Sequence, residues 1–265
     1  MSDSSLSLRC PRFDTPVPTQ AAPRAADGRA GRRPAEVALA VLLGVAALPV
    51  VVVASLLIRA TSRGPVFYTQ VRVGLGGRLF RIVKLRTMTH NCEAASGATW
   101  SAGRADPRVT AVGRVLRRLH LDELPQLWNV IRGDMALVGP RPERPEILAV
   151  LEADIPRVRD RLAVPPGVTG LAQIQQPADL TLDCVRRKLV YDRLYAERRS
   201  VWLDLRIVFG TVVYLAGASY DRVRKVAGLP APALAVTDVS AELTLLADDT
   251  AEVPALPARP LTRAG

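Results

Sequence analysis

Cysteine is scarce in this sequence of 265 residues, and aromatic side chains make up only 5% of it. The three cysteines, Cys10, Cys92 and Cys184, are odd in number and far apart. Their spacing excludes a disulfide scaffold and matches no zinc site, so reduced thiols in a cytosolic setting are the simple interpretation. The shortage of aromatic side chains leaves few surfaces on which nucleobases stack.

Lysine is almost absent, since only Lys84, Lys188 and Lys225 occur among the 36 basic residues. The formal net charge is nevertheless +11, so arginine supplies most of the positive charge. Such a charge is consistent with an anionic partner. The candidates are a membrane surface, a nucleic acid and a phosphorylated small molecule. The planar fork of arginine suits phosphate, although a genomic bias toward arginine codons gives the same composition.

Apolar periodicity is missing from both ends of the chain. Residues 1–34 are rich in Ser, Pro, Ala and Arg, and residues 226–265 are rich in Pro and Ala. Neither composition buries a core, so we predict a disordered tail at each end. The first tail is not a secretory signal, because the apolar stretch that follows starts too late.

Charge is absent from residues 37–58, which read VALAVLLGVAALPVVVVASLLI. As a straight helix this run is about 33 Å long, enough for the hydrocarbon core of a bilayer. A helix wholly buried inside a soluble protein is the alternative. Pro49 removes a backbone hydrogen bond near the middle of the run and predicts a kink.

The charges that flank this run favour one topology. Arginines occur on both sides, for example Arg33 before it and Arg59 after it. A crossing helix usually shows a bias of basic residues toward its cytoplasmic end, and neither end here resembles an external one. We therefore predict a re-entrant, kinked membrane helix over residues 35–60, with a kinked spanning helix as the alternative.

The chain after the membrane segment predicts a small α/β domain over residues 61–225. The β-rich runs 64–73 and 78–88 are joined by glycine-rich residues and indicate a β-hairpin. Residues 106–119 have a helical apolar stripe with Asp106 as the expected N-cap. We also expect a charged surface helix over 179–199.

A further helix is predicted after an acidic pair. Apolar residues at positions 124, 127, 128 and 131 have helical spacing, and Gly133 is a natural stop. Asp122 falls where the N-cap of this helix belongs, and a carboxylate there satisfies free N–H groups. The same position suits chemistry, because a carboxylate can attack phosphorus to form an acyl phosphate and Glu123 offers an oxygen ligand to Mg²⁺. The pattern alone leaves both interpretations open.

Basic residues near the pair are candidates for binding substrate phosphate. Arg117 lies just ahead of the pair, and Arg141 lies between two prolines that fix its backbone. Lys84 and Arg86, on the second strand of the expected hairpin, are weaker candidates. For each of these side chains, taken singly, the alternative to phosphate binding is a solvated position on the surface.

Five segments resemble, in the same order, the bacterial sugar transferases, which are monotopic polyprenyl-phosphate hexose-1-phosphate transferases. The segments are RGPVFYTQVRVG, FRIVKLRTM, DPRVTAVGRVLRRLHLDELPQLWNVIRGDMALVGPRP, PPGVTGLAQI and VWLDLRIVFGTVV. The resemblance covers about residues 36–220 and implies a re-entrant helix joined to a small cytosolic catalytic domain at the inner (cytoplasmic) membrane.

The resemblance also implies an activity. Members transfer a sugar 1-phosphate from a nucleotide-diphosphate sugar, here expected to be a UDP-sugar, to undecaprenyl phosphate, which initiates exopolysaccharide or glycoconjugate synthesis. By the same resemblance Asp122 is the nucleophile of a covalent aspartyl-phosphosugar intermediate and Glu123 is associated with Mg²⁺. Arg117 and Arg141 bind phosphate, and Pro49 matches the membrane proline.

Two departures and two rival functions qualify this expectation. His120 stands where the family more often has serine or threonine, and QQPADLT follows TGLAQI, so the transferred sugar is not fixed. The rivals are an inactive membrane-anchored scaffold and a basic nucleic-acid-binding protein. We expect a nucleotide-sugar, undecaprenyl phosphate and membrane lipid as partners, and no nucleic acid, with a homodimer left open.

Overall fold

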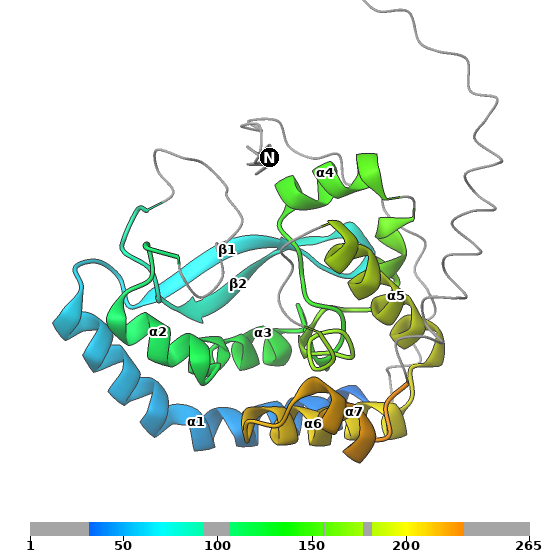
Figure 1. The fold of residues 1–265 in the computed structure, drawn as a ribbon. Coiled ribbons are helices and arrows are strands. Elements are labelled where there is room, and N and C mark those ends of the chain that lie inside the picture. Colours follow the sequence, from blue (N-terminus) through cyan, green and yellow to red (C-terminus); the bar gives the residue numbers. More distant parts are fainter. Residues whose placement is uncertain (1–31, 93–105, 156, 177–181, 231–265) are drawn as a thin grey trace, which may run out of the picture. The chain divides into compact units, whose positions relative to one another are not determined.

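The computed structural model describes residues 32–92, 106–155, 157–176 and 182–230, so most of both predicted tails lies outside the described residues. The architecture is a mixture of helices and short strands, as predicted (Figure 1). The helices and strands are α1 (Arg33–Thr61), β1 (Phe67–Val73), β2 (Leu79–Leu85), α2 (Ala111–Arg118), α3 (Gln126–Arg132), β3 (Ala136–Val138), α4 (Pro145–Asp154), β4 (Gly167–Thr169), α5 (Leu182–Arg198), α6 (Val201–Leu215) and α7 (Tyr220–Val226). The 3-10 turns are η1 (Leu75–Gly77), η3 (Leu121–Glu123) and η4 (Val158–Ala163).

The predicted β-hairpin is confirmed. Strands β1 and β2 pair in antiparallel register from Phe67 opposite Leu85 to Val73 opposite Leu79. The turn between them needs glycine, because Gly76 has a left-handed φ of 61°. The hairpin supplies one wall of the candidate site.

Helix α3 packs on the hairpin through the buried side chain of Asn129. Its Oδ1 accepts a hydrogen bond from the backbone N of Val83 at 3.0 Å, and its Nδ2 donates to the carbonyl of Arg81 at 2.7 Å. Around it an apolar cluster joins the hairpin, α3 and α1. This amide therefore fixes α3, and with it the acidic pair just before α3, against β2.

Strands β3 and β4 form a second, parallel pair, which the sequence did not indicate. Ala136 lies opposite Gly167, and Val138 lies opposite Thr169. The two chains approach so closely that a Cβ on Gly167 would come within 2.0 Å of the backbone N of Gly139. This close approach holds the loop after β3, which carries the Pro-Arg-Pro sequence, against the segment before β4.

Helix α1 lies along the folded body, with one stripe packed and the rest exposed. Ala40 packs on α3 and the hairpin, and Ala54 and Ile58 pack near α2. The exposed positions are almost all apolar, which is inconsistent with a wholly buried soluble helix. The large apolar residues among them are Leu39, Val41, Leu42, Leu43, Val45, Leu48, Val50, Val52, Val53, Leu56 and Leu57.

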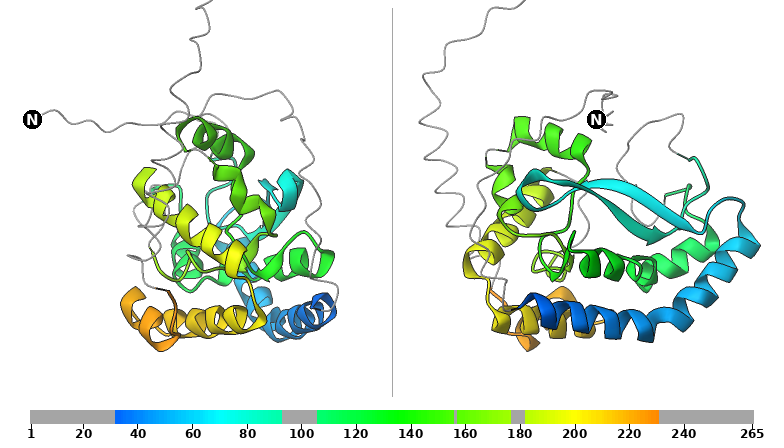
Figure 2. Two further views of the ribbon diagram at one scale, coloured as in Figure 1. Left: turned by 90° about the vertical axis from the view of Figure 1, so that its right-hand side faces the viewer. Right: turned by 180° about the vertical axis from the view of Figure 1, so that it is seen from behind.

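Both ends of α1 are held by polar contacts with the same folded body. At the first turn, Arg33 donates to the carbonyls of Val130 and Ile131, and Glu36 accepts from the backbone N of Leu137 at 2.7 Å. After the last turn, the guanidinium of Arg86 donates to the carbonyl of Ser62 at 3.0 Å. The helix contains Pro49 and bends along its length (Figure 2).

The largest core lies where α5, α6 and α7 meet β3 and β4. Tyr195, 2% exposed, donates to the carbonyl of Val138 at 3.0 Å and contacts Asp204 Oδ1 at 2.8 Å. Ala227 and Leu229 are buried in the same core. The folded part therefore extends past residue 226, where we placed the start of the C-terminal tail.

One predicted helix start differs from the observed one. The helix expected over residues 106–119 begins at Ala111, and Thr110, not Asp106, caps it by accepting from the backbone N of Gly113 at 2.9 Å. Asp106 instead forms an ion pair with Arg108 at 2.7 Å, so its carboxylate is engaged before the helix starts.

Candidate active site

Three separate elements bring the candidate residues together. The turn η3 carries Asp122 and Glu123, β2 carries Lys84, and the loop after β3 carries Arg141. The chain enters η3 through His120, whose left-handed φ of 56° turns it out of α2. The acidic pair and the arginine between prolines are thus close in space, as the sequence predicted.

Glu123 is enclosed by two cations. Its Oε1 accepts hydrogen bonds from Lys84 Nζ at 2.7 Å and from Arg141 Nη2 at 2.6 Å. Its Oε2 accepts from Arg141 Nη1 at 3.2 Å, so the arginine contacts both oxygens of the carboxylate. Burial raises the pKa of Glu123, but the charges and hydrogen bonds of Arg141 and Lys84 outweigh it and hold that pKa well below its usual range.

Asp122 is also buried, at 8% exposure, but no described residue forms a hydrogen bond or ion pair with its carboxylate. Burial, and then the negative charge of Glu123, raise its pKa, while the charges of Lys84, Arg141 and Arg117 act in the opposite direction. The N-cap interpretation is wrong, because Asp122 lies inside η3 and α3 begins after Pro125 without a side-chain cap. The carboxylate is therefore available for another role.

The remaining predicted phosphate ligands lie in different places. Arg117 donates through Nε to Thr87 Oγ1 at 2.8 Å, and its charge still acts on Asp122. Arg86 is not part of the cluster, since its described hydrogen bonds go to residues 62–64 after α1. Lys84 lies inside β2 and reaches Glu123 at 2.7 Å, whereas Arg86 lies just past the end of the strand, beside the residues that follow α1.

A second buried charge cluster adjoins the Pro-Arg-Pro loop, and sequence reasoning missed it. Glu143 Oε1 accepts from Lys188 Nζ at 2.6 Å and from Arg161 Nη1 at 3.4 Å. Arg161 Nη2 lies 2.8 Å from Asp192 Oδ2. Burial raises the pKa of Glu143, but Lys188 and Arg161 lower it far more. No local pattern marks these residues, because they come from η4, α5 and the loop after β3.

Mg²⁺ fits the pair only with help from a substrate. Among the described residues, no group of three or more His, Cys, Asp or Glu side chains is placed to hold a metal ion. Asp122 and Glu123 together offer at most two carboxylates, and Mg²⁺ commonly binds one or two carboxylates plus substrate phosphates and waters. The donor set is therefore compatible with Mg²⁺ that arrives with a diphosphate.

These features define a class of protein. A free buried carboxylate beside several cations is suited to phosphoryl-group transfer, and it stands on a body that carries a long, mostly exposed apolar helix. Residues 28–217 match the model of the family described as Bacterial sugar transferase. The chain belongs to that family, which confirms the resemblance seen in the sequence.

Curated relatives agree with this assignment. The chain is 43% identical over 183 residues to the UDP-glucose:undecaprenyl-phosphate glucose-1-phosphate transferase of Caulobacter vibrioides, a match that covers 68% of each protein. It is 43% identical over 164 residues to the UDP-N-acetylgalactosamine-undecaprenyl-phosphate N-acetylgalactosaminephosphotransferase of Aeromonas hydrophila. It is 40% identical over 186 residues to the undecaprenyl-phosphate glucose phosphotransferase of Komagataeibacter xylinus.

Coverage differs between these relatives. The matches to the second and third cover 62% and 68% of this chain but only 38% and 35% of the relatives' own lengths. The chain thus corresponds to about a third of those two proteins.

Proposed function

We propose that this protein transfers a sugar 1-phosphate from a nucleotide-diphosphate sugar to undecaprenyl phosphate, and so initiates synthesis of an exopolysaccharide or another glycoconjugate. The names of the relatives support the reaction class. The observation that carries the proposal is the contrast within the acidic pair: Glu123 is clamped by Lys84 and Arg141, whereas the buried carboxylate of Asp122 has no described partner.

The first half of the reaction uses Asp122 as the nucleophile. An oxygen of its carboxylate attacks the phosphorus that carries the sugar in a UDP-sugar. The new bond is an acyl phosphate, the bond from that phosphorus to the bridging oxygen breaks, and UMP leaves with the electron pair. Ionised Asp122 needs no general base for this step.

The second half returns the enzyme to its starting state. A phosphate oxygen of undecaprenyl phosphate attacks the phosphorus of the acyl phosphate. The bond to Asp122 breaks and its carboxylate is regenerated, and the product is a diphosphate-linked lipid sugar. Splitting the transfer in this way lets the soluble and the lipid substrate use one site in turn.

The neighbouring cations would stabilise the phosphates. Arg141 and Lys84 already hold an anion, the Glu123 carboxylate, and their charges also reach Asp122. Arg117 adds charge from the end of α2. When bound, Mg²⁺ would be held by Glu123 and supply further charge neutralisation for the diphosphate.

The geometry of α1 supports a re-entrant anchor in the inner membrane with the catalytic domain on the cytosolic side. The helix is long and apolar enough to cross a bilayer, by length and composition alone. However, polar contacts at Arg33 and Glu36 hold its beginning, and Arg86 holds the residues after its end, on the same body. A helix tied in this way enters and leaves the bilayer on one side.

The main rival function is an inactive scaffold with the same anchor. An inactive relative has no reason to keep a buried, unpartnered carboxylate, since burial without a partner costs free energy. The nucleic-acid-binding alternative has no explanation for the same feature. The measurement below separates the enzyme from both rivals.

The test is covalent trapping with the donor alone. Wild-type protein in nanodiscs is mixed with UDP-glucose, UDP-N-acetylgalactosamine and other UDP-sugars, and its intact mass is measured. We expect an added sugar phosphate and one equivalent of UMP before any lipid acceptor is supplied. In Asp122→Asn the amide cannot form the acyl phosphate, so the adduct should be absent and turnover should fall by several orders of magnitude.

Control and contrary results are defined in the same experiment. Asp221→Asn changes an exposed carboxylate on α7 and should keep wild-type behaviour. Wild-type turnover in Asp122→Asn, or kinetics that require both substrates bound together with no adduct, would show that the covalent mechanism is wrong. Lack of turnover with every donor would favour the scaffold.

A further inference from the structure

The Pro-Arg-Pro loop is held at every one of its carbonyls. Four consecutive carbonyl oxygens, from Pro140 to Glu143, each accept a hydrogen bond. Gly167 N donates to Pro140 O at 2.9 Å, and Arg161 Nη2 donates to Arg141 O at 2.8 Å. Arg72 Nη1 donates to Pro142 O at 3.0 Å, and Val73 N donates to Glu143 O at 2.9 Å. Because the two prolines have no N–H, these carbonyls are the main backbone groups through which hydrogen bonds can fix the loop.

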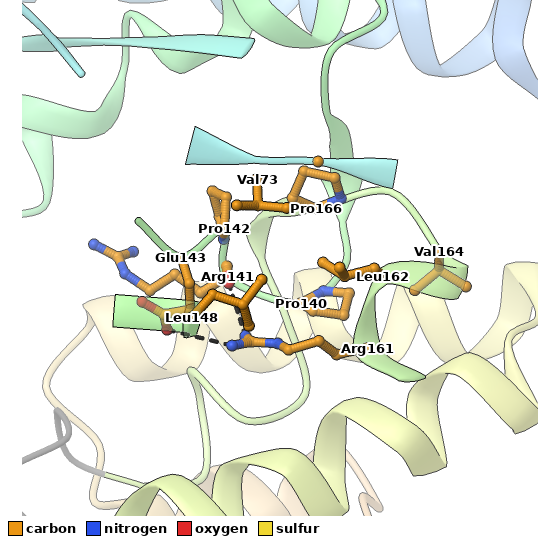
Figure 3. A pocket seen from close by; sticks show the side chains of 11 residues that line it. Val73, Pro140, Arg141, Pro142, Glu143, Leu148, Arg161, Leu162, Val164 and Pro166 are labelled. Carbon is orange, nitrogen blue, oxygen red and sulfur yellow. Dashed lines mark hydrogen bonds and ion pairs between the residues drawn. The ribbon is translucent and has the colours of Figure 1, made fainter. Parts of the chain in front are cut away.

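Arg161 is the donor that holds Arg141 itself. It comes from η4, twenty residues further along the chain, and is only 3% exposed. Figure 3 shows its guanidinium directed at the carbonyl of Arg141 and at the carboxylate of Glu143. Asp192 of α5 contacts the same guanidinium at 2.8 Å, so two carboxylates compensate the buried charge.

The side chain of Arg141 points away from Arg161 (Figure 3) and forms both contacts with Glu123. Arg141 is therefore held through its backbone carbonyl by Arg161, while its side chain binds Glu123 of the acidic pair. A movement of about 1 Å at a positioned catalytic group can lower the rate by about a hundredfold. The buried guanidinium thus lies where it controls the placement of a phosphate-binding arginine.

We propose that Arg161 is a positioning residue of the transferase site, and that it acts through Arg141 without touching the substrate. The proposal rests on the proposed function. Glu143 and Asp192 hold the guanidinium of Arg161, and Lys188 completes the charge balance at Glu143. The planar fork is essential, because one guanidinium faces three acceptors, whereas an ammonium is a point charge.

The main variant is Arg161→Lys, which keeps the positive charge beside Glu143 and Asp192 and so favours folding. The control is Arg159→Lys, two residues earlier in the same turn, where the arginine is half-exposed and pairs with Glu152 at the surface. Both are measured with the donor and lipid that wild type uses, beside Arg141→Ala and the double variant Arg141→Ala/Arg161→Lys. Thermal melting checks that each protein is folded.

We expect kcat/KM of Arg161→Lys to fall by about ten- to a hundredfold while Arg159→Lys stays near wild type. In the double variant, the Arg161 change should add less than about threefold to the loss in Arg141→Ala, because both changes affect one group. Full activity in a folded Arg161→Lys, or losses that multiply in the double variant, would overturn the proposal.

Hydrogen exchange tests the positioning without any turnover. The amides of Gly167 and Val73 donate to the loop carbonyls of Pro140 and Glu143. In Arg161→Lys these amides should exchange about tenfold faster, while the amide of Arg86, bonded to Val66 on the hairpin, should not change. Unchanged exchange at both loop partners overturns the proposal, whereas a wild type inactive with every donor overturns only the proposed function.

Discussion

Asp122 and Glu123 are adjacent in the chain and similarly buried, yet their carboxylates have opposite pKa shifts. Burial raises the pKa of both. The difference comes from partners, since Lys84 and Arg141 contact Glu123 directly and reach Asp122 only through space. The same environment thus contains one carboxylate, Glu123, that cations hold in its ionised form, and one carboxylate, Asp122, without a partner.

Removing the charge of Glu123 should stop the reaction without removing the nucleophile. Glu123→Gln leaves Lys84 and Arg141 without their shared anion and takes away the expected Mg²⁺ ligand, so turnover should fall by about a hundredfold or more while the fold survives. Wild-type activity should likewise be lost in excess EDTA and restored by Mg²⁺. Circular dichroism checks folding, and Glu152→Gln on α4 is the matched surface control.

Two results would contradict this prediction. Full wild-type activity in excess EDTA would exclude the Mg²⁺ requirement. A Glu123→Gln variant that keeps normal turnover would show that the cations hold the phosphates without help from this carboxylate.

At the scale of elements, α1 is long but is not independent of the folded body. Its 29 residues would measure about 44 Å as a straight helix, more than the hydrocarbon thickness of a bilayer. The stripe that includes Ala40, Ala54 and Ile58 packs on the hairpin and on α2 and α3. Only the opposite, apolar face is left for lipid, which favours a helix dipping into one leaflet.

Thiol labelling tests this topology. The three native cysteines are replaced by serine, and single cysteines are introduced at Ala35 or Thr61, which are exposed near the two ends of α1. In intact cells a membrane-impermeant maleimide added from outside should label neither site, and after permeabilisation it should label both. Labelling of one site alone from outside would mean that the helix crosses the membrane.

At the scale of the whole described body, apolar side chains gather on α6 as well as on α1. Trp202 and Phe209 are 69% and 51% exposed, and four further large apolar residues of α6 are also more than half exposed. The two helices run along the same side of the molecule in Figures 1 and 2, and Arg32 before α1 lies 3.8 Å from Asp204 of α6. Their combined face is larger than the isolated apolar patches usual on soluble proteins.

We predict that α6 lies in the membrane interface beside α1. A variant in which Trp100 and Trp128 are replaced by phenylalanine keeps Trp202 as its single tryptophan, and its fluorescence should be quenched in vesicles of brominated lipid. Moving the tryptophan to position 152 on α4, which Figure 1 draws on the opposite side, should remove the quenching. No quenching at position 202 would place α6 in water, and equal quenching at both positions would show that α6 has no closer contact with lipid than α4.

Local pattern in the sequence determined several features of this protein. The uncharged run 37–58, the glycines between the two strands and the spacing after Asp122 each predicted an element that the structure contains. The acidic pair and the arginine between prolines were also expected to meet, and they do. These features depend on neighbours in the chain, or on strongly characteristic residue types, and so they can be read from the sequence.

Tertiary structure decided the rest. Arg86 was expected at the phosphate site, but the carbonyls that follow α1 lie beside it and take up its guanidinium. Residues 179–199 were expected to form a charged surface helix, yet Lys188 within it is buried, as is Arg161. Glu143 pairs with Lys188, and Asp192 pairs with Arg161, each from another element. Whether a charged side chain faces water, a carbonyl or a carboxylate depends on which distant segments pack against it, and hydrophobic spacing along the chain carries no information about that choice.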